Sequence, residues 1–360
     1  GVFTDLLAEG ILAGIGGIVI FIPQIAFLFL FISLLEESGY MSRVVFLMDR
    51  LMRPFGLSGK SVVPLISGTA CAIPAVMATR TIENWKERLI TILVVPFTTC
   101  SARLPVYLII IALVIPEDRF FGLSYQALTL MLLYLMGFGA SILSAMALNK
   151  ILKIKSRSFF VIEMPNYKLP LFKNVIYTVW EKTKSFVLGA GKIILAISIV
   201  LWFLGSLNQR EKELEKKAKN EEISSFKLEN SYIGNMGKAI EPLVKPLGYD
   251  WKIGIAVLTS FAAREVFVGT LATIYSVGSD EEETIQNRMA AEVNSTTQKP
   301  LFNLASGISL LLFYAFAMQC MSTLAIVKRE TNTWKWPMAQ LVFMSLFAYI
   351  VALAAYQILK

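Results

Sequence analysis

The stretch Ser67-Gly68-Thr69-Ala70-Cys71-Ala72-Ile73-Pro74 interrupts an apolar segment of this 360-residue chain with small, polar and helix-breaking residues. A second apolar segment is interrupted in the same way by Ser260-Phe261-Ala262-Ala263-Arg264-Glu265-Val266-Phe267. Aligned without a gap, Cys71 corresponds to Arg264, and each stretch is followed by an apolar segment with a cysteine, Cys100 or Cys320. Interrupted hydrophobic segments at corresponding places in two halves are typical of transporters whose site lies at mid-membrane.

The composition around these stretches is that of a membrane protein. Hydrophobic residues make up 56% of the chain and charged residues 17%. Four stretches contain no Asp, Glu, Lys or Arg, namely 11–35, 120–149, 300–327 and 336–359. Each is long enough to cross a hydrocarbon core of about 30 Å. The sequence therefore predicts an all-α polytopic membrane protein with about eight hydrophobic segments, in two repeats with broken or re-entrant helices.

The segments divide the chain into two membrane halves. The first half, 1–207, holds one gate repeat over 61–115, in which Thr98-Thr99-Cys100-Ser101 is expected to join two half-helices between Pro96 and Pro105. Residues 36–60 follow the first span and fit an amphipathic helix at the membrane interface. The second half, 251–360, is expected to hold the other gate repeat and the C-terminal spans 301–327 and 337–359.

Charge predicts which loops face the cytoplasm. Residues 150–184 carry eight Lys or Arg against two Glu, so the positive-inside rule places them in the cytoplasm. The loop 208–250 holds eight basic and eight acidic residues and is expected to be external. The basic turn at 328–335 also favours the cytoplasm, which requires segment 251–277 to re-enter the membrane without crossing it. The sequence leaves the topology of 251–277 open.

The three cysteines are the first candidates for chemistry, because each lies at or beside a predicted break. The chain has no histidine, so a metal path would use sulfur, hydroxyl, carboxylate or carbonyl ligands. Sulfur from Cys71, Cys100 and Cys320 suits a first-row transition metal. Hydroxyls of Thr99 and Ser101 could complete a weak site, which suits transport because a tightly held ion cannot leave. Packing of these cysteines as small hydrophobic residues stays open.

Ionisable residues within the membrane are the second set of candidates. Charges at that depth are costly and usually functional. Glu265 could ligate a cation directly, while Arg264 and Arg103 are interpreted as ion-pair or gating residues. A purely structural ion pair of Glu265 with Arg264 or with Arg103 stays open.

Enzyme and nucleotide-binding functions find no support. The chain lacks histidine, a Cys-x-x-Cys pair and paired intramembrane aspartates, so no catalytic residues and no bound cofactor are expected. The Gly56-Leu57-Ser58-Gly59-Lys60-Ser61 stretch ends like a phosphate-binding loop, but Pro54 stands where that motif needs its first glycine.

Several runs of sequence resemble the membrane domain of the bacterial ferrous iron transport protein B family, and the resemblance covers nearly the whole chain. The runs are Gly16-Gly17 with Phe21-Ile22-Pro23-Gln24-Ile25, Leu34 to Arg43, Met48 to Arg53, Gly56 to Ser61, Ala78 to Thr81, Cys100 to Tyr107, and Ala263-Arg264-Glu265-Val266 with Val268-Gly269-Thr270-Leu271. In that family two such segments are called gate motifs, and cysteines matching Cys71, Cys100 and Cys320 are proposed to handle Fe²⁺.

The resemblance implies import of Fe²⁺, as transported substrate, by a multi-pass protein of the bacterial cytoplasmic (inner) membrane. Family members carry an N-terminal GTP-binding domain, which is absent from this chain, so GTP, Mg²⁺ and any GTPase activity are expected only there. Expected partners are the lipid bilayer, that domain, small accessory iron-transport proteins and further copies of the chain, but no nucleic acid. The alternative is a gate-type carrier of nucleosides or another organic solute, whose transport would survive loss of all three sulfurs.

Overall fold

The computed structural model describes residues 11–120, 122–152, 167–192, 195–196, 199, 232–261, 264, 266–274, 302–318 and 320–360. Most of these residues are helical, and two strands of two residues each, β1 (Arg119–Phe120) and β2 (Leu123–Ser124), pair as an antiparallel hairpin. The helices of the first half are α2 (Ala13–Glu37), α3 (Tyr40–Met52), α4 (Val62–Ala70), α5 (Ala72–Ala78), α6 (Trp85–Val94), α7 (Leu104–Val114), α8 (Tyr125–Ile151) and α9 (Phe172–Phe186). Helix α13 (Tyr232–Val244) lies within the segment that the sequence predicts as the loop 208–250. The helices of the second half are α14 (Trp251–Thr259), α15 (Val266–Ile274), α17 (Leu304–Phe316), α18 (Met321–Thr331) and α19 (Lys335–Leu359).

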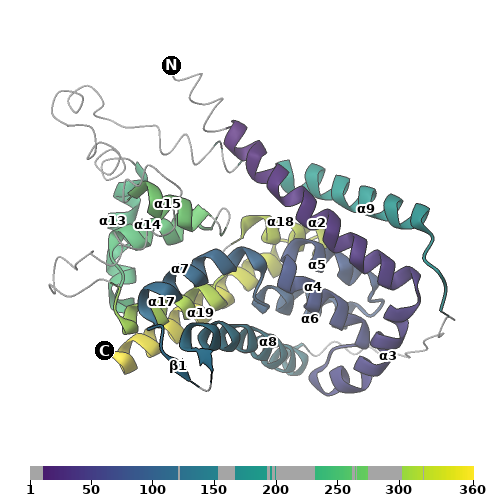
Figure 1. Cartoon of the computed structure of the whole chain (residues 1–360), viewed down its shortest axis with the longest axis horizontal. Coiled ribbons are helices and arrows are strands. Elements are labelled where there is room, and N and C mark those ends of the chain that lie inside the picture. The colour runs from purple at the N-terminus through teal and green to yellow at the C-terminus, as the bar shows by residue number, and fades with distance from the viewer. Residues whose placement is uncertain are drawn as a thin grey trace.

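Figure 1 shows the arrangement of these helices. Two hydrophobic cores hold them together. One core joins α2, α4, α5 and α6 of the first half, and it also takes in Ile326 and Val327 of α18. The other joins α14, α15, α17 and α19 of the second half, and it also takes in Val106, Tyr107 and Ile109 to Ile111 of α7 and Leu133 of α8. Each half therefore contributes residues to the core of the other.

The predicted break in 61–79 is confirmed. Helix α4 ends at Ala70, Cys71 is extended with φ −156° and ψ 133°, and α5 starts at Ala72. Segment 87–115 divides as expected into α6 and α7, with Thr98 and Cys100 extended between them. Pro96 and Pro105 each stand at the start of a helical turn, where a missing N–H costs nothing.

The second half contains two breaks as well. Helices α14 and α15 are separated at 260–265, as predicted for segment 251–277. The sequence predicts a span over 301–327 with Cys320 at or beside a break, and the structure shows this break. Helix α17 ends at Phe316, Ala317 and Cys320 are extended, and α18 begins at Met321. No proline marks this break, and it is held by tertiary contacts.

Within the described residues, four segments are long and apolar enough to cross a membrane: 85–114, α8, 304–331 and α19. Residues 22–37 and 40–55 could form a fifth, bent by 87° where α2 meets the amphipathic helix α3. The chain is thus an all-α polytopic membrane protein. The total of about eight segments stays a prediction, because segment 185–207 and the loop 208–250 lie largely outside the described residues.

Candidate metal path at the helix breaks

The three cysteines occupy the same local position in three different breaks. Cys71 directly precedes α5, Cys100 directly precedes the 3-10 turn Ser101–Arg103, and Cys320 directly precedes α18. Each has an extended backbone, and each is a free thiol. At such a position the backbone N–H groups of the next turn have no partner within their own helix and point towards the cysteine. The sequence thus places a soft sulfur beside polar backbone at each break.

One hydrogen bond ties the two breaks of each half together. In the first half, the Ser101 hydroxyl donates to the Ala70 carbonyl at 2.8 Å, and Gln24 Nε2 donates to Ser101 Oγ at 2.6 Å. In the second half, the Met321 N–H donates to the Phe261 carbonyl at 3.1 Å. The bonds to Ala70 and Phe261 satisfy carbonyl groups that the broken helices leave without a partner of their own.

Arg264 connects the breaks of the two halves. Its side chain is buried, and its Nη1 lies 3.3 Å from Cys100 Sγ, as donor to the sulfur. Arg103 is wholly buried nearby and donates to the carbonyls of Thr98 and Pro96 at 3.4 and 3.3 Å. The centre of the protein therefore holds two guanidinium groups around the break at Thr98–Cys100. The predicted contact of Arg264 with Glu265 is not tested, because Glu265 lies outside the described residues.

Close helix approach shapes the wall around this break. A Cβ on Gly68 of α4 would meet Thr98 Oγ1, and a Cβ on Gly137 of α8 would lie 2.8 Å from Thr99 Oγ1. Thr99 is fully buried, and its hydroxyl forms no hydrogen bond within the described residues. The hydroxyl of Tyr107 lies beside it without reaching hydrogen-bond geometry. Thr99 thus offers a free oxygen next to Cys100.

The three cysteines and Arg264 lie in one region of the structure. Nevertheless, no group of three or more Cys, Asp or Glu side chains among the described residues has the arrangement of a metal site. The structure brings the predicted residues into one region and places Arg264 among them, and their role as a metal path stays a prediction.

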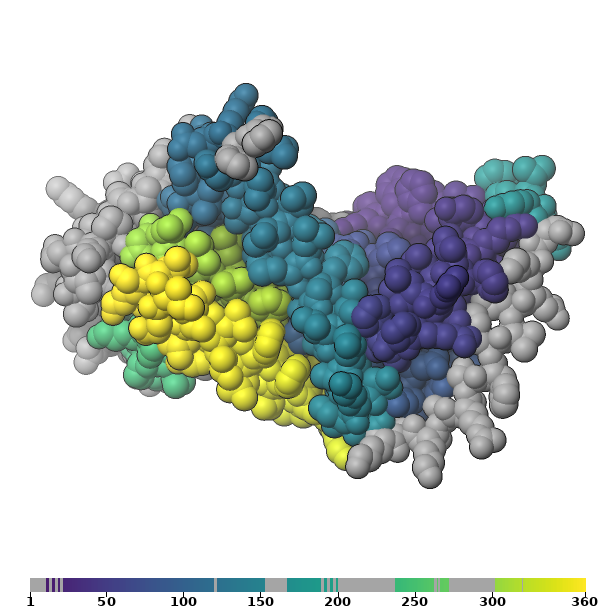
Figure 2. Space-filling view, turned by 90° about the horizontal axis from the view of Figure 1, so that it is seen from below, coloured from purple at the N-terminus to yellow at the C-terminus, as the bar shows by residue number. Residues whose placement is uncertain are grey.

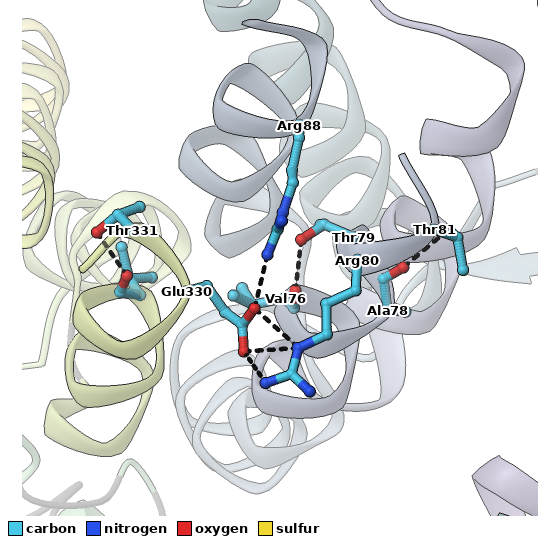
Figure 3. Close-up of polar contacts among 9 residues, drawn as sticks. Val76, Ala78, Thr79, Arg80, Thr81, Arg88, Glu330 and Thr331 are labelled. Carbon is cyan, nitrogen blue, oxygen red and sulfur yellow. Dashed lines mark hydrogen bonds and ion pairs between the residues drawn. The ribbon is translucent and has the colours of Figure 1, made fainter. Parts of the chain in front are cut away.

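The sequence missed a charged cluster at one end of this region. Glu330 of α18 has a side chain only 3% exposed and accepts from two arginines (Figure 3). Arg80, which follows α5, binds it with Nε at 2.9 Å and Nη2 at 2.5 Å, and Arg88 of α6 binds it with Nη2 at 2.8 Å. The bonds to Glu330 raise the pKa of Arg80 above its usual value. Glu330 lies about 250 residues from its partners, so no local pattern could have paired them.

The Gly56–Ser61 stretch has a structural role. The Gly59 N–H donates to the buried Asp49 carboxylate at 2.9 Å, and a Cβ on Gly59 would collide with the Val45 carbonyl. The Arg53 side chain pairs with the same carboxylate. Glycine is therefore required here for close packing of this turn against α3.

Comparison with known proteins assigns the chain to a family. A family model described as "Gate: Nucleoside recognition" matches residues 18–114 and 187–334, which include all four breaks. A second, described as the ferrous iron transport protein B C terminus, matches 130–182. No solved structure shows significant similarity to the chain.

Curated relatives match along the whole chain. The chain is 46% identical over 359 residues to a protein of Leptospira interrogans named Fe(2+) transporter FeoB, covering 99% of this chain and 51% of that protein. A relative with the same name in Leptospira biflexa is 47% identical, with 100% and 51% covered. A Porphyromonas gingivalis protein, named as a fusion of Fe(2+) transport protein A with Fe(2+) transporter FeoB, is 36% identical, with 99% and 44% covered. The chain spans about half the length of these relatives, and together the matches show that it belongs to the ferrous iron transport protein B family and contains the family's gate domain.

Proposed function

We propose that this chain forms the membrane path by which Fe²⁺ enters a bacterial cell across the inner membrane. The observation that carries the proposal is the shared position of Cys71, Cys100 and Cys320, each the extended residue that opens a helical turn at a break. Soft sulfur beside backbone groups that have no partner in their own helix suits brief binding of a first-row transition metal. The relatives named as Fe(2+) transporters support iron as the substrate.

The two halves are proposed to be repeats of one broken-helix plan. Each half has two broken helices in succession, and in each a single hydrogen bond joins the first break to the second. The alignment that pairs Cys100 with Cys320 agrees with the place of both residues at the second break of their half. Such repeats allow one half to move against the other around a fixed site.

Arg264 is proposed to close the path. An Fe²⁺ ion bound to Cys100 would lie only a few ångströms from the guanidinium that now donates to the sulfur. At about 4 Å and an effective dielectric constant of about 20, a divalent and a monovalent cation repel by roughly 8 kcal/mol. Fe²⁺ can therefore occupy Cys100 only after Arg264 has moved, and Glu265, which follows it in the chain, is proposed to receive the ion or the arginine. Thr99 and Ser101 supply oxygen beside the sulfurs, and Arg103 holds the break in place.

Other parts of the proposal concern the longer relatives. We place a GTP-binding domain, with its Mg²⁺, in the part of those proteins that this chain does not cover, and we assign any GTP hydrolysis to it. The fusion relative supports a small accessory iron-transport protein as a partner. Assembly into a homo-oligomer is also proposed, and nucleic acid is not a proposed partner.

Iron uptake into vesicles tests the proposal. Full-length protein containing this domain should take up Fe²⁺, and the triple variant Cys71→Ser, Cys100→Ser, Cys320→Ser should lose uptake while it still inserts and melts like the unchanged protein. Mg²⁺ in excess should not compete, because it favours oxygen ligands. Unchanged Fe²⁺ uptake by the triple variant would refute the sulfur path.

A carrier of nucleosides is the second candidate, because the matching gate model is described as nucleoside recognition. The same vesicles separate the two functions. Uptake of a labelled nucleoside that survives the triple serine substitution, with no uptake of Fe²⁺ by the unchanged protein, would favour the carrier.

A further inference from the structure

An apolar groove of about 740 Å³ runs between α8 and α19. Figure 2 shows the face on which α19 (yellow) lies beside α8 (teal). The groove is lined on the α8 side by Gly139 and Leu143 and on the α19 side by Trp336 and Phe343, with Phe97 and Phe316 also in its lining. Leu143 and Phe343 are more than half exposed although they face this groove. Within a membrane, such a surface is covered by hydrocarbon.

The dimensions of the groove decide what kind of hydrocarbon fits. Its lining on α8 runs from Met136 to Ile151, which is about 22 Å at 1.5 Å per residue. A groove of this length with an almost wholly apolar lining accommodates an extended acyl chain. Its length suits a lipid of one leaflet.

One end of the groove carries positive charge. Lys86, at the start of α6, donates to the Asn149 carbonyl near the end of α8, and Arg88 pairs with Glu330 just before α19. The C-terminus of α8 and the N-terminus of α19 therefore lie at the same end. Exposed Lys150 precedes the lining residue Ile151, and exposed Lys335 precedes the lining residue Trp336. Tryptophan is a residue type that favours the headgroup region. This is the end that the charge pattern predicts to be cytoplasmic.

We propose that this groove binds an anionic phospholipid of the cytoplasmic leaflet. Its acyl chain lies along Phe97, Phe316 and Phe347, and its phosphate lies between Lys150 and Lys335. Each lysine near an anionic lipid surface contributes a factor of about five to binding. Positive charge at one end of the groove and an apolar lining along the rest favour an anionic lipid as its occupant.

The proposed lipid would touch both halves of the protein next to their breaks. Phe97 directly precedes Thr98, and Phe316 directly precedes the break at Ala317–Cys320. Phe347 packs edge-on against both rings, with centroids 6.2 and 5.2 Å away. The acyl chain would thus contact the residues that lead into the breaks at Thr98 and Ala317.

Native mass spectrometry of the full chain in mild detergent tests the groove. Phosphatidylglycerol and phosphatidylcholine with identical acyl chains serve as probes. Gly139→Leu should fill the groove without a clash, because a Cβ on Gly139 meets no atom within 4 Å. We expect it to weaken retention of phosphatidylglycerol at least tenfold. Gly16→Leu is the matched control, since its Cβ also meets no atom within 4 Å but lies on α2, and it should bind like the unchanged protein.

A second pair of variants tests the headgroup. Lys150→Gln with Lys335→Gln should weaken phosphatidylglycerol binding about 25-fold, a factor of about five for each lysine, and leave phosphatidylcholine unaffected. Lys360→Gln, at the opposite end of α19, should change neither. Equal binding of both lipids by the unchanged protein, or equal retention by the Gly139→Leu and Gly16→Leu variants, would overturn the proposal. So would loss of a dimer in the Gly139→Leu variant, because a second copy would then be the occupant.

Discussion

Replacing Glu330 by glutamine should destabilise the protein, because it removes the buried negative charge that two arginines bind. The carboxylate is buried, with 3% of its side chain exposed, and it receives hydrogen bonds from Arg80 and Arg88. Hydrogen bonds to charged groups contribute about 1.5–3 kcal/mol each. Glutamine keeps the shape, but its amide N–H group would face a guanidinium donor.

The two arginines limit the cost, because they are 45% and 22% exposed and can regain water. Removal of one partner from a fully buried pair costs about 3–5 kcal/mol. With this discount for solvent screening, we expect Glu330→Gln to lower the free energy of unfolding by about 2–3 kcal/mol.

Glu83→Gln is the matched control. Its carboxylate pairs with Lys60 at 3.0 Å, but its side chain is 88% exposed. The same substitution there should cost less than about 1 kcal/mol. Denaturant unfolding in detergent, followed by tryptophan fluorescence, compares the two variants. Equal midpoints for Glu330→Gln and Glu83→Gln would show that the cluster does not stabilise the contact between α18 and the first half.

Three further predictions concern packing, the break and topology. Gly59→Ala should destabilise the protein by about 1–3 kcal/mol in thermal unfolding, because its Cβ meets the Val45 carbonyl, whereas Gly16→Ala should not destabilise it; equal melting would contradict the packing role of Gly59. Gly68→Val should bring the valine side chain into collision with the Thr98 hydroxyl and displace α4 from the break, so Fe²⁺ uptake in vesicles should fall. Full uptake by this variant would show that the close approach of Gly68 to Thr98 does not shape the path. In a background without native cysteines, Thr333→Cys should react with an impermeant thiol reagent only from the cytoplasmic side and Glu117→Cys only from outside; labelling of both from one side would refute the assigned orientation.

The sequence determined the class of fold, and it also determined most of the break positions. Uncharged stretches of 24 or more residues can only be membrane segments. Proline and glycine revealed the break at 61–79, and proline revealed the one at 87–115, because both residue types act on the local backbone. Glu265 and the sidedness of the loops stay predictions. No proline marks the break before Cys320, and the hydrogen bond that holds it, from the Met321 N–H to the Phe261 carbonyl, joins residues 60 positions apart in the chain.

The tertiary structure alone decided which residues of the two halves meet. Arg264 was a candidate from its depth in an apolar segment, but its contact with Cys100 joins residues 164 positions apart. No local pattern marks Glu330 as a partner of distant residues, and only the packing of α18 against α5 brings it to Arg80 and Arg88. Periodicity and residue type act over one or two helical turns, so they fix where helices form and break. Two features depend on how whole helices bury their apolar faces, which no local pattern encodes. One is the pairing of distant charges, and the other is the packing of residues of α7 and α18 in the core of the opposite half.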